Sequence, residues 1–285
     1  MRSLPRADLA GVAVGGDAPV VVMGALNVSP ESFHAGSVYR DRGALVEAAA
    51  AMVEAGAALV DVGARSTAPY LDADIPEDEE TRRLAAAVDV LVAKLSVPVS
   101  ADTCRPGPAR AALESGARVL NDVHGLRDPA LARLVAEHEV GVILMACPEP
   151  AAGDQTPLQA TRVLLGACLA RARRAGARED RTVLDPGVGF FRTGSVAWHA
   201  RDVAVLARLG ELSVLGRPLA VGISRKSFIG ALTGREATAD RLAGSLAATA
   251  VAVLNGAALV RTHDVRETVD AVRVAERLRG AGRDA

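Results

Sequence analysis

The 285-residue sequence predicts a single α/β domain folded as a (β/α)8 barrel, the TIM-barrel architecture. Short runs of β-branched apolar residues alternate with longer segments whose apolar residues recur every three or four positions, which is the pattern of repeated βα units. Polar residues stand where the apolar runs end. The carboxyl ends of the strands of a closed barrel converge on one mouth, where active sites of this fold are built.

Eight strands and eight helices are expected in alternation. Each expected strand is a short apolar run, and each expected helix has apolar residues at helical spacing. The strands are expected at 20–26, 58–62, 97–101, 118–121, 141–145, 182–184, 219–222 and 258–261. The helices are expected at 41–55, 77–94, 108–115, 129–137, 157–175, 197–209, 241–255 and 265–279.

A doubly wound open sheet would give a similar local alternation, so the polar residues decide between the two folds. An open sheet would spread them along one edge, whereas a closed barrel gathers them at its mouth. No long linker or compositional break divides the chain, so we expect one domain over 1–285 with a core at about 20–280. The residues at strand ends are Asn27, Asp61, Asp102, Asn121, Asp185 and Arg261.

Composition and charge argue against several classes of protein. Half of the residues are hydrophobic and 24% are charged, an ordinary globular balance. The formal net charge of −1 argues against general binding to nucleic acid. The sequence has neither the apolar stretch of a signal peptide nor a run long enough to cross a membrane, so no membrane association is expected. Cys104, Cys147 and Cys168 fit neither a disulfide framework nor a paired metal site, which is typical of a protein of the reducing cytoplasm.

Five groups of segments carry the polar residues of the predicted mouth. Any one of them is weakly specific, but their order and spacing resemble those of the dihydropteroate synthases from about residue 20 to residue 280. The resemblance implies a pterin-binding barrel. The segments are MGALNVSPESF (23–33), DVGARSTAPY (61–70), SADT (100–103) with ND (121–122), LDPGVGF (184–190), and GISRKSFIG (222–230) with VRTHD (260–264).

A pterin ring presents N–H donors beside a carbonyl acceptor, so its site needs carboxylates, an amide and a cation. Hydrogen bonds to an ionised carboxylate are about twice as strong as neutral ones. An aspartate after a strand is often only a turn residue or a helix cap, but four complementary groups at separate strand ends fit that interpretation poorly. The resemblance assigns the same four residues to pterin recognition, with Lys226 near the ring carbonyl and N5. These four are Asp102, Asn121, Asp185 and Lys226.

An anion site is expected beside the ring site. Arg261 and His263 alternate at the end of the last predicted strand and Asn27 ends the first, and a closed barrel makes these strands neighbours. By resemblance, Arg261 and His263 hold the phosphate oxygens and Thr67 contacts the pterin diphosphate. The resemblance also implies Mg2+ as the cofactor, coordinated by Asn27 through the diphosphate. Mg2+ often keeps waters and takes few protein ligands, so no carboxylate cage is needed.

The resemblance implies a transferase of folate biosynthesis. The amine of p-aminobenzoate would attack the methylene carbon of 6-hydroxymethyl-7,8-dihydropterin diphosphate, displacing diphosphate and giving 7,8-dihydropteroate. Lys226, Arg261 and His263 are the expected catalytic residues, because Lys226 meets the ring and the other two stabilise the departing charge. Ser227 stands at the expected start of a helix, whose backbone N–H groups could meet the aminobenzoate carboxylate.

Two loops depart from the usual bacterial pattern of the family. The family commonly reads ESTRP where this chain has RSTAP, so Ala68 stands in place of an arginine and a positive charge appears at Arg65. It commonly reads SFSDGG where this chain has SFHAG (32–36), so Ala35 stands in place of an aspartate. The chain is therefore expected to be a divergent member whose second-substrate site is altered.

These departures leave three alternative functions open. The divergent loops resemble those of synthases for methanopterin-like cofactors, which would use a p-aminophenyl ribitol-type amine. A pterin-binding methyltransferase shares the barrel but has no reason to assemble an arginine and a histidine around a diphosphate. A non-catalytic pterin-binding homologue would bind the pterin diphosphate without releasing diphosphate. The resemblance also implies a homodimer, and the apolar late helices could provide its interface.

Overall fold

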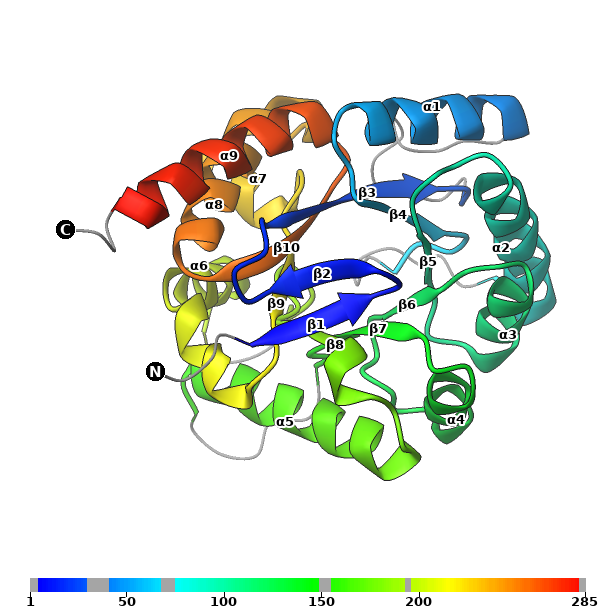
Figure 1. The fold of residues 1–285 in the computed structure, drawn as a ribbon. Helices are drawn as coiled ribbons and strands as arrows, with labels where there is room; N and C mark the ends of the chain where they lie inside the picture. Colours follow the sequence, from blue (N-terminus) through cyan, green and yellow to red (C-terminus); the bar gives the residue numbers. More distant parts are fainter. Residues whose placement is uncertain (1–4, 30–40, 68–74, 149–154, 193–195, 282–285) are drawn as a thin grey trace.

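A computed structural model of the chain contains a closed barrel of eight parallel strands surrounded by helices (Figure 1). The structure describes residues 5–29, 41–67, 75–148, 155–192 and 196–281. Around the barrel the strand order is β10-β3-β4-β5-β6-β7-β8-β9, so successive strands pair and the last strand closes on β3. This arrangement confirms the predicted (β/α)8 fold and excludes the open sheet.

The barrel strands and the helices lie within two residues of the predicted ranges wherever a prediction was made. The strands are β3 (Val21–Asn27), β4 (Leu59–Gly63), β5 (Val99–Asp102), β6 (Val119–Asp122), β7 (Gly141–Met145), β8 (Thr182–Asp185), β9 (Leu219–Gly222) and β10 (Ala257–Thr262). The helices are α1 (Arg42–Glu54), α2 (Glu77–Val92), α3 (Pro106–Glu114), α4 (Pro129–Glu137), α5 (Pro157–Ala175), α6 (Trp198–Ala207), α7 (Ser227–Thr233), α8 (Leu242–Leu254) and α9 (Val265–Ala281). In the described part of the chain, the 3-10 helices η2 (Glu179–Arg181), η3 (Leu209–Leu215) and η4 (Thr238–Arg241) join some of these elements.

Local sequence explains where several helices begin. Thr156 and Gln159 form a capping box at the start of α5, and Asp128 caps α4 by accepting from the backbone N–H of Ala130. Proline occupies the first helical position of α3, α4 and α5, where its missing N–H removes no helical bond. Helix α7 was not among the predicted helices, although its start at Ser227 was predicted.

An antiparallel hairpin, β1 (Arg6–Leu9) with β2 (Val12–Gly15), precedes the barrel and was not predicted. Leu9 and Val14 are fully buried against inward-facing barrel residues such as Met23 and Ile143. Figure 1 shows the dark-blue hairpin lying across one end of the ring of strands. The hairpin therefore closes the amino-terminal end of the barrel, and the polar mouth opens at the opposite, carboxyl end.

Two further findings concern membrane spans and disulfides. In the part of the chain that the structure describes, no single helix is long and apolar enough to cross a bilayer. One bent pair of helices, 227–233 with 238–254, has the length and apolar composition only when the two are taken together. Cys104, Cys147 and Cys168 all lie in that part, and none forms a disulfide.

Candidate active site

A cavity open to solvent lies at the carboxyl ends of the barrel strands. Every residue that the sequence analysis assigned to the site lines it. The side chains come from strand ends or from the loops that follow them, so the barrel brings together positions spread over more than 230 residues of sequence. These nine residues are Asn27, Thr67, Asp102, Asn121, Asp185, Lys226, Ser227, Arg261 and His263.

An ion-pair network crosses the floor of the cavity. The Arg261 guanidinium donates from Nε to Asp61 Oδ2 at 2.6 Å and from Nη2 to Asp102 Oδ2 at 2.9 Å. Asp61 is fully buried and also accepts from Ser100 Oγ at 2.6 Å and from Asn121 Nδ2 at 3.1 Å. The network ties β4, β5, β6 and β10 together. It also fixes the Asn121 amide, whose Nδ2 is occupied by Asp61.

Asp102 is a buried carboxylate and Asp185 a partly buried one, and the protein only partly satisfies both. Asp102 Oδ1 has no hydrogen-bond partner among the described residues. Burial raises the pKa of Asp102 to about 7, although the positive charge of Arg261 opposes the rise. Burial also raises the pKa of Asp185, against the opposing effects of Lys226 and of the Gly187 N–H that donates to Asp185 at 2.7 Å. Such carboxylates can accept hydrogen bonds from a ligand that enters the cavity.

The ammonium group of Lys226 lies at the edge of the cavity, beside the loop that follows β8. Its Nζ donates to the carbonyl oxygen of Val188 and lies 4.5 Å from the centroid of the Phe190 ring. Burial lowers the pKa of Lys226 to about 8, while the negative charges of Asp185 and Asp202 oppose the fall. The Lys226 ammonium group is therefore protonated at neutral pH but loses its proton at a lower pH than an ordinary lysine does.

Gly189 and Asp202 shape the seat of Lys226, and the sequence analysis identified neither. Gly189 has a φ of +83°, and a Cβ there would lie 2.7 Å from Lys226 Cδ. Its N–H donates to both carboxylate oxygens of the fully buried Asp202 at 3.0 Å. A side chain on α6 thus fixes the turn against which Lys226 packs. The GVGF segment hinted at this turn, but nothing local marks Asp202 as its partner.

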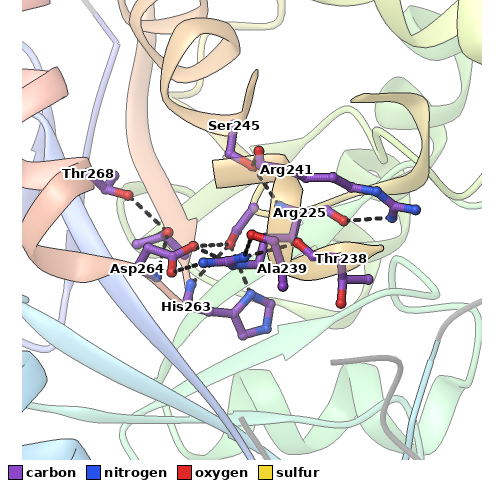
Figure 2. A network of polar contacts seen from close by, with 10 residues as sticks. Arg225, Thr238, Ala239, Arg241, Ser245, His263, Asp264 and Thr268 are labelled. Atoms are coloured by element: carbon purple, nitrogen blue, oxygen red, sulfur yellow. Dashed lines mark hydrogen bonds and ion pairs between the residues drawn. The ribbon is translucent and has the colours of Figure 1, made fainter. Parts of the chain in front are cut away.

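His263 is held by a network that links the loop after β9 to the loop after β10 (Figure 2). His263 Nδ1 lies 2.9 Å from Ser224 Oγ. Arg225 donates to both oxygens of Asp264, from Nε at 2.9 Å and from Nη2 at 2.7 Å. Its Nη1 also donates to the carbonyl oxygen of Thr238 at 2.9 Å. Arg225 thus clamps the two loops that carry Lys226 and His263.

Arg65, the charge that the sequence places before Ser66 and Thr67, lines the cavity from the loop after β4. Its Nε donates to Glu80 Oε2 at 3.1 Å and its Nη2 to Cys104 Sγ at 3.2 Å. The buried Glu80 also accepts from Thr103 Oγ1 at 2.6 Å and from Arg105 Nη1 at 3.1 Å. Arg65 is therefore anchored on the β4–β5 side of the mouth by a carboxylate that it shares with a second arginine.

Comparison with known proteins identifies the family. A family model described as pterin binding enzyme matches residues 23–263, most of the chain. A dihydropteroate synthase of Mycobacterium leprae is 42% identical over 270 residues, which cover 90% of this chain and 93% of that protein. The chain belongs to the dihydropteroate synthase family.

Solved structures of dihydropteroate synthases share the fold over nearly the whole chain. A structure of the Xanthomonas albilineans synthase with 4-aminobenzoic acid is 39% identical, with a TM-score of 0.85, and covers 97% of this chain and 98% of that one. A second structure from that organism, in complex with 7,8-dihydropteroate, is 38% identical with a TM-score of 0.83. A probable bifunctional folylpolyglutamate synthase/dihydropteroate synthase of Haloferax volcanii is 40% identical over 260 residues, but this chain spans 30% of its length.

Membership of this family accounts for the polar residues at the barrel mouth. Two positions at which the sequence departs from the usual family pattern fall outside what the structure describes. Ala35 and Ala68 lie outside the described residues. Thr67 and Arg65, at the described edge of the second loop, both line the cavity.

The cavity can be tested for a metal. Among the described residues, no three His, Cys, Asp or Glu side chains gather in a way that could hold a metal ion. Asn27 lines the cavity at the end of β3 and offers one neutral amide oxygen. Mg2+ accepts such a donor when phosphate oxygens and waters complete its octahedron. The donor set therefore fits a Mg2+ ion that arrives with a diphosphate.

Proposed function

We propose that this chain condenses 6-hydroxymethyl-7,8-dihydropterin diphosphate with p-aminobenzoate, giving 7,8-dihydropteroate and diphosphate. One observation carries the proposal: a buried carboxylate with an unsatisfied oxygen, a second, partly buried carboxylate, an oriented amide, an ammonium group and a guanidinium converge on a single cavity. This set complements both a pterin ring and an anionic leaving group. The names of the relatives, and the two ligands in the Xanthomonas structures, support the same reaction.

The ring is recognised at the β5, β6 and β8 strand ends. Asp102 Oδ1 and the Asp185 carboxylate accept N–H groups from the aminopyrimidine edge. Because Asn121 Nδ2 donates to Asp61, its carbonyl oxygen is left to accept from the ring. Lys226 donates to the ring carbonyl and N5. An analogue without those ring donors would leave a buried carboxylate unsatisfied, so it would bind poorly.

The diphosphate is held at the β10, β3 and β4 strand ends. A guanidinium has five N–H donors, and Arg261 directs Nε and Nη2 to Asp61 and Asp102, so it can add phosphate bonds through Nη1. A His263 ring that accepts from Ser224 at Nδ1 carries its proton on Nε2, the form that donates to a phosphate oxygen. Thr67 adds its hydroxyl group. Mg2+ is proposed to bind with the diphosphate, to Asn27, and would neutralise part of the leaving-group charge.

The reaction needs orientation and charge neutralisation more than it needs a base. The C–O bond to the diphosphate breaks, the leaving oxygen keeps the electron pair, and the electron-rich pterin stabilises the methylene cation. Arg261 and His263 stabilise the departing charge. The amine nitrogen then forms the C–N bond and releases its proton to solvent. The residues therefore act by fixing the ring and the leaving group around one carbon atom.

The assembly is proposed to be a homodimer. Helices α8 and α9 pack on each other and expose four large apolar side chains: Val251, Leu254, Val274 and Leu278. A partner surface that covered them would remove apolar area from water. Two buried thiols, Cys104 and Cys168, fit a reducing compartment, and we propose the cytoplasm.

The proposed reaction is tested by following diphosphate release with Mg2+ and dihydropterin diphosphate, while identifying the pterin product by mass. The proposal expects release that depends on p-aminobenzoate and a product with the mass of dihydropteroate. Faster turnover with the p-aminophenyl ribitol amine would assign the chain to methanopterin-type synthesis. Binding of the pterin without diphosphate release from any arylamine would make it a non-catalytic homologue.

A further inference from the structure

Glu80, a buried carboxylate on the first turn of α2, lies outside the cavity and joins the loops that follow β4 and β5. Its Oε2 accepts from Arg65 Nε in the first of these loops and from Arg105 Nη1 in the second, both at 3.1 Å. Its Oε1 accepts from Thr103 Oγ1 at 2.6 Å. Glu80 is 1% exposed, and the proposed recognition of the ring and of the diphosphate does not use it.

The two arginines that share Glu80 differ in what else holds them. Arg105 Nη1 also donates to the carbonyl oxygen of Ile75 at 2.7 Å, so the backbone before α2 restrains it as well. Arg65 Nη2 donates to Cys104 Sγ at 3.2 Å, and a thiol is a weak acceptor. Burial raises the pKa of Cys104 to about 12, so this thiol carries no charge at neutral pH. The charge of Arg65 is therefore matched by Glu80 and not by the thiol.

The position of Arg65 makes this restraint important for the site. Gly63 pairs with Asp102 across β4 and β5, and Arg65 follows Gly63 by two residues. Arg65 lines the cavity, and Asp102 Oδ1 has no hydrogen-bond partner among the described residues. A guanidinium is attracted to a buried carboxylate oxygen that lacks a partner, because the bond is charge-assisted and pairs a charge removed from water. Without Glu80, Arg65 would compete with a ligand for this oxygen.

We propose that Glu80 is a positioning residue that holds Arg65 away from Asp102 and so keeps one oxygen of that carboxylate open to the pterin ring. The inference rests on the proposed recognition of the ring by Asp102. The need for such a residue arises from a departure of this chain. The usual family pattern has a glutamate at position 65, whereas the arginine here brings a positive charge to the edge of the ring site.

Isothermal titration with 6-hydroxymethylpterin, which carries the ring but no phosphate, tests the proposal. Glu80→Gln keeps an acceptor for Thr103 but removes the charge that holds Arg65, so affinity should fall about tenfold, the lower end for a lost charged hydrogen bond. Arg65→Gln should stay within about threefold of wild type, since Arg65 has no proposed contact with the ring. The double variant Glu80→Gln/Arg65→Gln should return to within about threefold of wild type, because the competing guanidinium is gone.

The double variant separates competition by Arg65 from simpler effects of losing Glu80. Burial raises the pKa of Asp102, and the negative charge of Glu80 adds to the rise. Loss of that charge alone would therefore favour the ionised carboxylate and tighten ring binding. Lost packing around Glu80 would weaken binding in the single and the double variant alike. Competition by Arg65 predicts weaker binding that the second substitution reverses.

Arg105→Gln is the matched control, since it removes the other arginine bound to Glu80 and should leave pterin affinity within about threefold of wild type. The thermal midpoint of each variant reports folding. Should Glu80→Gln not fold, Glu80→Asp keeps the charge but shortens the side chain, and should show a smaller loss that Arg65→Gln again reverses.

The outcomes that overturn the inference are distinct from those that refute the proposed function. Unchanged affinity in a folded Glu80→Gln protein, or a double variant that binds as weakly as Glu80→Gln alone, overturns the inference. Absence of pterin binding by the wild-type protein would refute the proposed ring recognition, and this inference with it.

Discussion

Arg261 and Asp61, which stand 200 residues apart in the chain, form an ion pair of 2.6 Å at the floor of the barrel mouth. Asp61 is fully buried, and the same carboxylate orders Ser100 and Asn121. A buried charge costs free energy unless it is paired. The pair of Arg261 and Asp61 therefore stabilises the barrel only while the other hydrogen bonds of the network are also made. The closure of the barrel and the orientation of the site therefore depend on the same contacts.

Asp61→Asn is expected to destabilise the protein and misplace Arg261. Removing one partner of a buried pair costs about 3–5 kcal/mol, and the remaining bond from Arg261 to Asp102 places the expected loss in the free energy of unfolding near the lower end. Urea denaturation measures this loss. The matched change Asp180→Asn breaks an exposed pair with Arg178 and should leave the unfolding midpoint unchanged. Equal effects of the two substitutions would contradict the network's role.

The dependence of kcat/KM on pH should be a narrow bell. Burial raises the pKa of Asp102 to about 7, and its ionised form accepts the ring N–H groups, so kcat/KM for the pterin substrate should fall as pH drops below about 7. Burial lowers the pKa of Lys226 to about 8, and its protonated form donates to the ring, so kcat/KM should fall again as pH rises past about 8. Asp102→Asn should abolish the acid limb and keep the basic limb. An acid limb that survives this substitution would assign it to another group.

Gly189→Ala is expected to displace Lys226. Alanine at a φ of +83° costs about 1–2 kcal/mol of stability, and its Cβ would come within 2.7 Å of Lys226 Cδ. Gly216→Ala is the matched control, since Gly216 has a φ of +72° and nothing within 4 Å of the added Cβ. Both variants should lose similar stability, but only Gly189→Ala should lower kcat/KM, by about tenfold, a change of about 1.4 kcal/mol. Denaturation and steady-state kinetics together separate backbone strain from displacement of Lys226.

Asp264→Asn should weaken the anion site by releasing Arg225 and, with it, the loop that carries Ser224 beside His263 (Figure 2). Affinity for inorganic diphosphate is expected to fall about tenfold, whereas affinity for 6-hydroxymethylpterin, which lacks phosphate, should be unchanged. Calorimetric titration with each ligand measures both. Asp240→Asn, at an exposed position nearby, should change neither affinity. A parallel loss of both ligands would mean that the substitution disturbs the whole mouth.

The barrel and the predicted site could be read from the sequence because both depend on local signals. Buried parallel strands read as short apolar runs, and a polar residue at the end of such a run must face the mouth. That reasoning placed Asp102, Asn121 and Asp185 in one cavity. The hairpin β1–β2 was missed because each of its four-residue strands buries only one or two side chains, too few to give a clear alternation.

Residues that act through distant partners gave no local signal. Asp202 reads as a surface charge on a helix, and its burial depends on a turn at Gly189 that folds over it. The direction of Arg65 depends on Glu80, the buried member of the acidic first turn of α2. Arg192 lies over the ring of Trp198 at the start of α6, and no local pattern in the sequence marks that contact.

Binding of 6-hydroxymethyl-7,8-dihydropterin diphosphate to the wild-type protein and to Asp185→Asn tests the central claim most directly. The claim is that the strand-end carboxylates recognise the pterin ring at the barrel mouth. Isothermal titration should show one site per chain in the wild type and an affinity about 10- to 100-fold weaker in the variant, the range of a lost charged hydrogen bond. Equal affinities in two folded proteins, or no binding to the wild type, would contradict it.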